Sequence, residues 1–218
     1  MLGVNIDMTD QWTVDHAFFA RFFSFMSRHE SESLRAWRRQ NLAGLYGRVL
    51  EIGAGTGTNF ALYPSSVTEV IAIEPERRLS EIARAAAKSA PVPVTVTDRT
   101  IETFDPGEPF DAAVCSLVLC RVDEPEKVLR QVFSLLRPGG ELRYLEHVAS
   151  DGMPGRLQRL ADATVWPQLF GNCHMHRDTE GAIVDAGFRL GEVARTPPRF
   201  MRMVHGRAVR PAPTAVDE

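Results

Sequence analysis

Short apolar runs alternate with amphipathic stretches along most of the chain. The runs at residues 68–73, 92–97 and 111–116 have the length and the β-branched content of buried strands. Between the first two, residues 76–89 carry apolar side chains at positions i, i+3, i+4 and i+7, which places them on one face of a helix. These side chains are Leu79, Ile82, Ala83 and Ala86. Strands that alternate with helices in this way are typical of a mainly parallel sheet covered by helices on both faces.

The rest of the chain continues the alternation and predicts a single doubly wound α/β domain with a mainly parallel, seven-stranded, Rossmann-like sheet. The remaining predicted elements are a strand ending at residue 52, a short crossover helix at 59–63, a helix that Asp123 caps and Pro125 starts, a strand at 141–146, a helix from residue 153, a capped helix at 179–186, and closing strands at 188–194 and 201–209. We divide the chain into an N-terminal helical segment (1–47), the α/β domain (48–210) and a polar, disordered tail (211–218).

The N-terminal segment is unusual because aromatic residues cover most of one predicted helix. Residues 14–29 contain Phe18, Phe19, Phe22, Phe23, Phe25 and Met26. This is more apolar area than a solvated helix exposes comfortably. One interpretation is a helix packed onto the domain, and a sharper one is a lid whose aromatic side chains close over a ligand site. A second helix is predicted to start at the capping residue Ser31 and to end at Gly47.

Composition narrows the possible functions. The chain has 218 residues, with 25 basic and 28 acidic side chains and a net charge of −3, so no basic block indicates a nucleic-acid partner. Three cysteines are too few for a disulfide framework, and the acidic N-terminus lacks the basic start of a signal peptide. No apolar run reaches the roughly 20 residues that a membrane span needs. We therefore expect a cytoplasmic protein, and its arginine-rich positive charge fits a GC-rich bacterial genome.

A glycine-rich loop follows the first predicted strand. The sequence VLEIGAGTG has Glu51 two residues before Gly53, and Gly55 and Gly57 follow; Glu74 then ends the second strand. Glycines allow a sharp turn and a close approach of a ligand, and a carboxylate at the second strand end is placed to bind a ribose diol. The spacing departs from G-x-G-x-x-G, and a carboxylate at position 51 suits a cationic ligand better than a pyrophosphate. A dinucleotide oxidoreductase and a glycine turn without a ligand are the alternatives.

This loop and its acidic partner resemble the first motif of class I S-adenosylmethionine-dependent methyltransferases. Residues 110–148 resemble the block between the fourth and fifth strands of the quinone-type methyltransferases. The endings LVLC and LEHV, the later run WPQLFGNC and Arg177 are most similar to the thiol S-methyltransferase group of methyltransferase-like proteins and their bacterial relatives. The resemblance covers most of residues 49–209. It implies S-adenosylmethionine as the cofactor and a small molecule as the acceptor.

The resemblance also implies which residues bind the cofactor. Glu74 would bind the ribose, and Pro75 would border the adenine. The family often has an aspartate near the adenine, whereas Thr100 and Ile101 stand there, so the backbone amide of Ile101 would read the base. The residues expected around the methionine end are Glu51, Gly53, Ala54, Gly55, Gly57, Cys115 and Ser116. Those expected around the acceptor or in the lid are Phe19, Phe22, Phe23, Trp166 and Arg177.

The reaction needs little from the protein, because the sulfonium methyl is already electrophilic and the nucleophile must chiefly be held in line with it. A nearby imidazole could raise the thiolate fraction of a thiol acceptor, and His147 at the end of the fifth strand is the candidate base. A histidine that only makes a structural hydrogen bond is the alternative. Cys173, His174 and His176 lack the usual zinc spacing, so we expect no metal. Arg177 could bind a substrate carboxylate or pair with a neighbouring acidic residue.

The sequence thus predicts an S-adenosylmethionine-dependent methyltransferase that acts on a small molecule, with S-methylation of a thiol favoured. The alternative within enzymes is O-, N- or C-methylation of a quinone-like or natural-product metabolite. A non-catalytic S-adenosylmethionine-binding protein is a third possibility, but an aromatic lid that excludes water from the methyl group favours turnover. Acceptor identity and oligomeric state are left open at this stage.

Overall fold

A seven-stranded sheet forms the centre of the protein, in a computed structural model that describes residues 17–164, 166–197 and 201–212. The strand order is β3-β2-β1-β4-β5-β7-β6, and β7 is antiparallel to both of its neighbours while β1 to β5 are parallel. The strands are β1 (Gly47–Ile52), β2 (Val67–Ile73), β3 (Val94–Thr97), β4 (Phe110–Ser116), β5 (Leu136–His147), β6 (Arg189–Arg195) and β7 (Met203–Val209). This is the predicted doubly wound, mainly parallel sheet.

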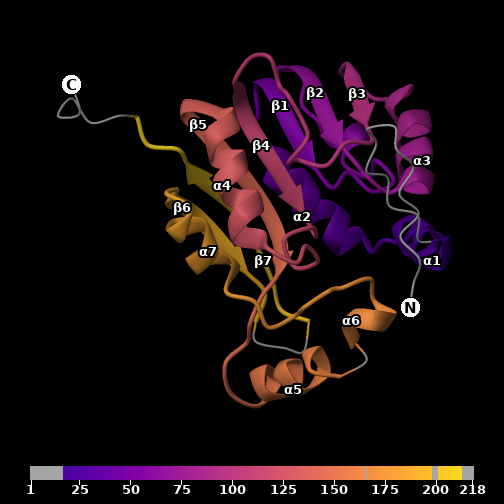
Figure 1. Cartoon of the computed structure of the whole chain (residues 1–218), viewed down its shortest axis with the longest axis vertical. Coiled ribbons are helices and arrows are strands. Elements are labelled where there is room, and N and C mark those ends of the chain that lie inside the picture. The colour runs from indigo at the N-terminus through magenta and orange to yellow at the C-terminus, as the bar shows by residue number, and fades with distance from the viewer. Residues whose placement is uncertain (1–16, 165, 198–200, 213–218) are drawn as a thin grey trace.

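Helices cover both faces of the sheet because its central strands are apolar on both sides. In β1, Leu50 and Ile52 join the cluster under α4 and α7, and Val49 joins the cluster on the opposite face with Leu42 of α2 and Ala83 of α3. Figure 1 shows α4 and α7 in front of the sheet, and α5 and α6 beyond the ends of the strands. The helices are α1 (Ala17–Arg28), α2 (Glu32–Leu42), α3 (Arg77–Ala87), α4 (Pro125–Leu135), α5 (Gly152–Asp162), α6 (Trp166–Leu169) and α7 (Thr179–Asp185).

Several predicted boundaries are wrong, each for a local reason. The crossover helix expected at 59–63 is only the 3₁₀ turn η1 (Phe60–Leu62), because Pro64 follows at once and cannot continue a helix. Gly47 opens β1 and does not end α2, which stops at Leu42. Strand β5 runs from Leu136 to His147 and so begins before the predicted strand at 141–146; a bulge near Gly139, whose φ is 80°, lies in the added part. The N-cap of α4 is Glu124 rather than Asp123.

Two other predictions fall partly or wholly outside the described residues. The expected first helix began at residue 14, and the structure describes it from Ala17. Most of the tail, from residue 213, is also outside the described part of the chain. Among the described helices, none has the length and apolar character needed to cross a membrane.

A buried polar network attaches α2 to the sheet. The Arg38 guanidinium donates to Asn59 Oδ1 (3.1 Å), and Asn59 Nδ2 donates to Glu51 Oε1 (2.9 Å). The Tyr63 hydroxyl donates to the other carboxylate oxygen of Glu51 (2.7 Å). Burial of Glu51, which is 2% exposed, outweighs these bonds and raises its pKa to about 7. A partly desolvated carboxylate therefore lies at the centre of the domain, at the end of β1.

This carboxylate should make the stability of the protein depend on pH near neutrality. The folded-state pKa of Glu51 lies above the ordinary value of 4.5, so its stabilising contribution is complete below pH 4.5 and is lost as pH rises through about 7. We expect the free energy of unfolding to fall by up to about 3 kcal/mol from this source between pH 5 and pH 8. Glu51→Gln should remove that slope. Urea unfolding of both proteins across this pH range measures it, and parallel curves for the two would contradict the assignment.

Candidate functional site

The glycine-rich loop leaves β1 with a backbone that only glycine adopts easily. Gly53 and Gly55 have φ values of 64° and 59°. A Cβ added at Gly53 would lie 2.5 Å from the Val118 side chain, and one at Gly55 would lie 2.7 Å from the Phe23 ring. Phe23 belongs to α1, and Val118 belongs to the turn after β4. The glycine loop is therefore contacted by both of these segments.

Glu74, at the end of β2, holds this loop in place. Its Oε2 accepts the Gly55 N–H at 2.7 Å, and its Oε1 accepts the Glu76 N–H at 3.0 Å. The side chain is largely buried, and burial raises its pKa against the effect of these two hydrogen bonds. Each carboxylate oxygen can accept more than one hydrogen bond, so Glu74 keeps acceptor capacity for a ligand.

A cavity of about 620 Å³ opens beside Glu74 at the carboxyl ends of the parallel strands. Ligands of doubly wound sheets bind at this edge, and the volume suits a small-molecule ligand. Six predicted site residues line it: Gly53, Gly55, Glu74, Pro75, Ser116 and Phe23. The residues of its wall that the sequence did not single out include Leu79, Leu117, Val118, Arg121, Gln168 and Asn172.

Other predicted site residues lie outside this wall. Thr100 is half-buried, and Ile101 is buried with its carbonyl oxygen accepting from the Gln131 side chain (2.8 Å). Arg177 donates to the Leu119 carbonyl oxygen (3.2 Å) and lines a separate cavity. The buried members of the predicted set, beneath the loop or in the sheet, are Glu51, Ala54, Gly57 and Cys115.

Besides Arg177, two of the expected acceptor and lid residues have side chains that the structure describes, Trp166 and Phe23. The Trp166 ring stacks on Phe170 with centroids 4.0 Å apart, and both pack against a small buried cluster beside the end of β4. The side chains of Phe19 and Phe22 lie outside the described part of the structure. Phe23 lines the cavity, and the Arg121 guanidinium carbon lies 5.1 Å from its ring centroid.

Glu146 is a structural residue of the site. The sequence places it at the end of a predicted strand but does not indicate what it does. It is fully buried near the end of β5, and its carboxylate accepts the backbone N–H groups of Val118 (3.0 Å), Leu119 (2.9 Å) and Cys120 (3.2 Å). These three bonds shape the turn after β4, where Leu117 has a positive φ of 58°. Its position at the end of the predicted strand at 141–146, directly before His147, was the available signal.

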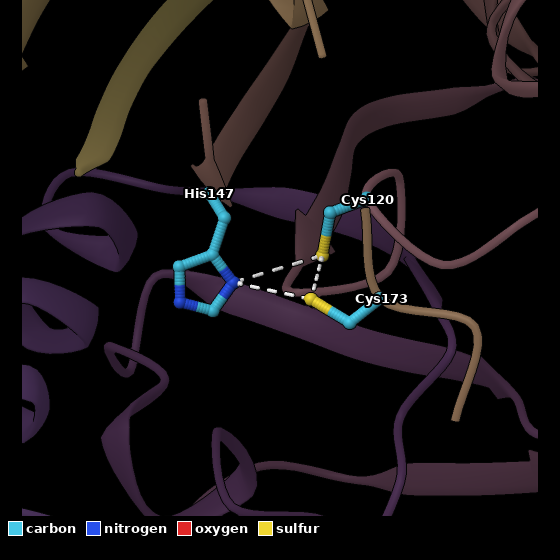
Figure 2. Close-up of side chains that lie close together, drawn as sticks. All are labelled: Cys120, His147 and Cys173. Carbon is cyan, nitrogen blue, oxygen red and sulfur yellow. Dashed lines mark hydrogen bonds between the residues drawn. The ribbon is translucent and has the colours of Figure 1, made fainter. Parts of the chain in front are cut away.

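The same turn brings Cys120 to His147 and Cys173. The two sulfur atoms are 3.8 Å apart, and His147 Nδ1 lies 3.9 Å from Cys120 Sγ and 3.6 Å from Cys173 Sγ. Figure 2 shows the three side chains converging from separate segments: the turn after β4, the end of β5 and the loop after α6. We call them the Cys-His-Cys cluster. The Cys120 thiol and then His147 lower the pKa of Cys173 to about 5, and the pKa of Cys120 is raised.

Cys173, His174 and His176, which are close in the sequence, do not group together in the structure. His176 Nε2 lies 2.9 Å from an Arg159 nitrogen, and the His174 ring is within 3.3 Å of the Asn172 side chain. The backbone N–H of His174 instead donates to the Cys120 carbonyl oxygen (2.7 Å), which aligns the loop with the turn. The three side chains have different partners, and those of Cys173 come from other elements.

Comparison with known proteins identifies the family to which the chain belongs. Residues 16–190 match the methyltransferase domain family. The chain is 30% identical to the thiol S-methyltransferase TMT1B of Mus musculus over 213 residues, which cover 88% of this chain and 86% of that protein. It is also 30% identical to the phosphatidylethanolamine N-methyltransferase of Cereibacter sphaeroides over 183 residues, covering 80% and 84% of the two chains.

The fold agrees with this assignment. The crystal structure of the N-methyltransferase NodS from Bradyrhizobium japonicum, in complex with S-adenosyl-L-homocysteine, superposes with a TM-score of 0.66 at 16% identity, covering 88% of this chain and 98% of that one. The matched family spans the glycine loop, Glu74 and the cavity between them. The chain therefore belongs to the methyltransferase domain family, and it is an S-adenosylmethionine-dependent methyltransferase.

Proposed function

We propose that this enzyme transfers the methyl group of S-adenosylmethionine to the sulfur of a small thiol. The observation that carries the proposal is the match to a thiol S-methyltransferase over 88% of the chain. The human thiol S-methyltransferase TMT1A is also similar, at 32% identity over 158 residues. Because the phosphatidylethanolamine N-methyltransferase is 30% identical as well, an N- or O-acceptor is the second candidate.

We assign the cofactor to the cavity beside the glycine loop. Gly53 and Gly55 let the backbone approach the methionine end closely, and Ser116 at the end of β4 faces the same space. Glu74 would accept both ribose hydroxyls while its hydrogen bonds to Gly55 and Glu76 hold it in position. Pro75 would border the adenine. Glu51 lies behind the loop and acts through its charge on the cationic cofactor.

The chemistry is a single displacement. The acceptor sulfur, as thiolate, attacks the methyl carbon in line with the carbon–sulfonium bond. A new S–C bond forms, the bond to the sulfonium breaks with its electron pair, and S-adenosylhomocysteine leaves as a neutral thioether. The protein must position the two sulfur atoms and remove the acceptor's proton. His147, which lies at the carboxyl edge of the sheet next to Glu146, is placed to contribute to the second task, either as a base or through a bound metal ion.

Phe23 is proposed to act as a lid residue. Its ring forms part of the cavity wall and lies against the glycine loop, so α1 covers the methyl-transfer site from the side opposite β4. Excluding water there protects the thiolate from hydration and strengthens the electrostatic attraction between the thiolate and the sulfonium. A protein that only bound the cofactor would have no need for such a cover.

The cofactor assignment predicts a specific loss of affinity. Glu74→Ala removes the acceptor of the ribose hydroxyls and should weaken S-adenosylhomocysteine binding by on the order of 2 kcal/mol, or about 30-fold. Isothermal titration measures the change. Glu69→Ala is the matched control, because Glu69 lies in the same strand but pairs with Arg48 (2.5 Å), away from the cavity. Equal affinity of the Glu74 variant and the wild type would refute the assignment.

The lid assignment predicts a difference between two phenylalanines of the same helix. Phe23→Ala opens the cavity wall and should raise the Kd of S-adenosylhomocysteine about tenfold, from the apolar contact that is lost. It should also lower kcat/KM for the acceptor. Phe25→Ala should change neither, because Phe25 is 58% exposed on α1. Identical kinetics of the Phe23 variant and the wild type would show that α1 serves packing alone.

The acceptor assignment predicts a preference between nucleophiles of similar size. An alkyl or aryl thiol should be methylated at least about tenfold faster than the corresponding alcohol or phenol at pH 7.5, because a few per cent of the thiol is already a strongly nucleophilic thiolate. Transfer of a labelled methyl group to a panel of thiols, phenols and amines measures this. Faster methylation of the phenol or amine members would favour the second candidate and overturn S-methylation.

A further inference from the structure

The Cys-His-Cys cluster has the dimensions of a zinc site. With Zn–S bonds of about 2.3 Å and a Zn–N bond of about 2.0–2.1 Å, tetrahedral coordination separates two sulfur ligands by about 3.8 Å and a sulfur from a nitrogen by about 3.5–3.6 Å. The observed separations are 3.8 Å between the sulfurs, and 3.6 and 3.9 Å from them to His147 Nδ1. Three donor atoms therefore lie near three corners of a zinc tetrahedron (Figure 2).

A disulfide explains this arrangement less well. A bonded pair of sulfurs is 2.03–2.05 Å apart, so Cys120 and Cys173 at 3.8 Å would have to approach considerably. A disulfide also gives no reason for an imidazole nitrogen within 4 Å of both sulfurs. The three atoms all lie within 4.8 Å of one another, as donors around one central ion would.

The chemistry of the donors selects a thiophilic ion. Two thiolates and an imidazole favour Zn²⁺ over Mg²⁺ or Ca²⁺, which prefer oxygen ligands. The thiolates balance the double positive charge of the ion, which matters because Cys120 is 1% exposed and Cys173 is 8% exposed. Backbone bonds hold Cys120: its N–H donates to Glu146, and its carbonyl oxygen accepts from the N–H of His174, the residue after Cys173. Outer bonds of this kind orient metal ligands.

We propose that Cys120 Sγ, Cys173 Sγ and His147 Nδ1 bind one Zn²⁺ ion, and that its fourth position takes the sulfur of the acceptor thiol. Three protein ligands with one open position are typical of catalytic rather than structural zinc. The cluster adjoins the cofactor cavity, because Arg121 follows Cys120, Asn172 precedes Cys173, and both line the cavity wall. This inference rests on the proposed function, since it names how the acceptor of that reaction is activated.

Coordination would supply the thiolate without a general base. When the thiol replaces a water molecule on Zn²⁺, its proton is released to solvent, and the bound sulfur remains a thiolate at neutral pH. It attacks the methyl carbon, the carbon–sulfonium bond breaks, and the neutral thioether product binds zinc weakly and is replaced by water. His147 then acts as a metal ligand rather than as the base expected from the sequence. The expectation that the chain binds no metal was based on the spacing of Cys173, His174 and His176 alone.

The first test is metal binding by the reduced full chain, with Co²⁺ as an absorbing substitute for Zn²⁺. One equivalent should bind, with the visible bands of a tetrahedral ion and the near-ultraviolet charge-transfer band of thiolate ligands, and Zn²⁺ should displace it. Cys173→Ser and His147→Ala should weaken Zn²⁺ binding by more than about 100-fold. His174→Gln and His176→Gln are the matched controls and should bind as the wild type does. Binding of S-adenosylhomocysteine by each variant verifies that it is folded.

The second test is acceptor binding at the metal. Adding an alkyl thiol to the Co²⁺ protein should shift the visible bands, and a phenol of similar size should not. Metal-free protein should methylate the thiol at least about tenfold more slowly, with recovery after one equivalent of Zn²⁺. Failure to bind stoichiometric metal, or equal binding by the ligand variants, would overturn the site. Full thiol methylation by metal-free protein would overturn the metal's role while leaving S-methylation intact.

Discussion

Two buried carboxylates at the carboxyl edge of the sheet hold the loops on which the site depends. Glu74 accepts the backbone N–H groups of Gly55 and Glu76 beside the cavity and holds the glycine loop against the end of β2. Glu146 does the same for the turn after β4 through three backbone N–H groups. Buried carboxylates are costly unless their hydrogen bonds are satisfied, and here the donors are loop amides that would otherwise lack partners. The hydrogen bonds from these amides therefore offset part of the free-energy cost of burying each carboxylate, and they fix the conformation of the loop that donates them.

The two carboxylates act on neighbouring segments of this edge. Glu74 holds the loop that follows β1, which forms part of the cavity wall. The turn that Glu146 holds carries Val118, which contacts the glycine loop, and Cys120, which faces His147 and Cys173. The cavity and the Cys-His-Cys cluster thus share one structural element, the turn after β4. Displacement of that turn would affect both the wall of the cavity and the geometry of the cluster.

The family relationship identifies the cofactor but leaves the acceptor open, because proteins described as S-, N- and O-methyltransferases all match the chain. If the cofactor binds as proposed, the acceptor would be selected by Phe23 from α1, by the loop after α6 and by the Cys-His-Cys cluster. Loops and attached segments are where such folds vary their substrates.

Local spacing in the sequence was sufficient for the fold and for the cofactor loop. The alternation of apolar strands with amphipathic helices predicted the seven-stranded sheet, and the glycines with Glu74 predicted three residues of the cavity wall, Gly53, Gly55 and Glu74. These signals are readable because each depends on a few neighbouring residues and on the rule that parallel strands end at one edge. Boundaries were less certain where a single proline or glycine decided them, as at Pro64 and Gly139.

The Cys-His-Cys cluster was decided by tertiary structure alone. Cys120, His147 and Cys173 are separated by more than twenty residues at each step, and no local pattern marks them as partners. Reading nearby residues together instead grouped Cys173 with two histidines that point elsewhere. Only the parallel pairing of β4 with β5, the turn that Glu146 shapes and the hydrogen bond from His174 to Cys120 bring the three side chains within 4 Å of one another. Spacing along a chain predicts local structure, whereas distances between segments are set by how the whole sheet packs.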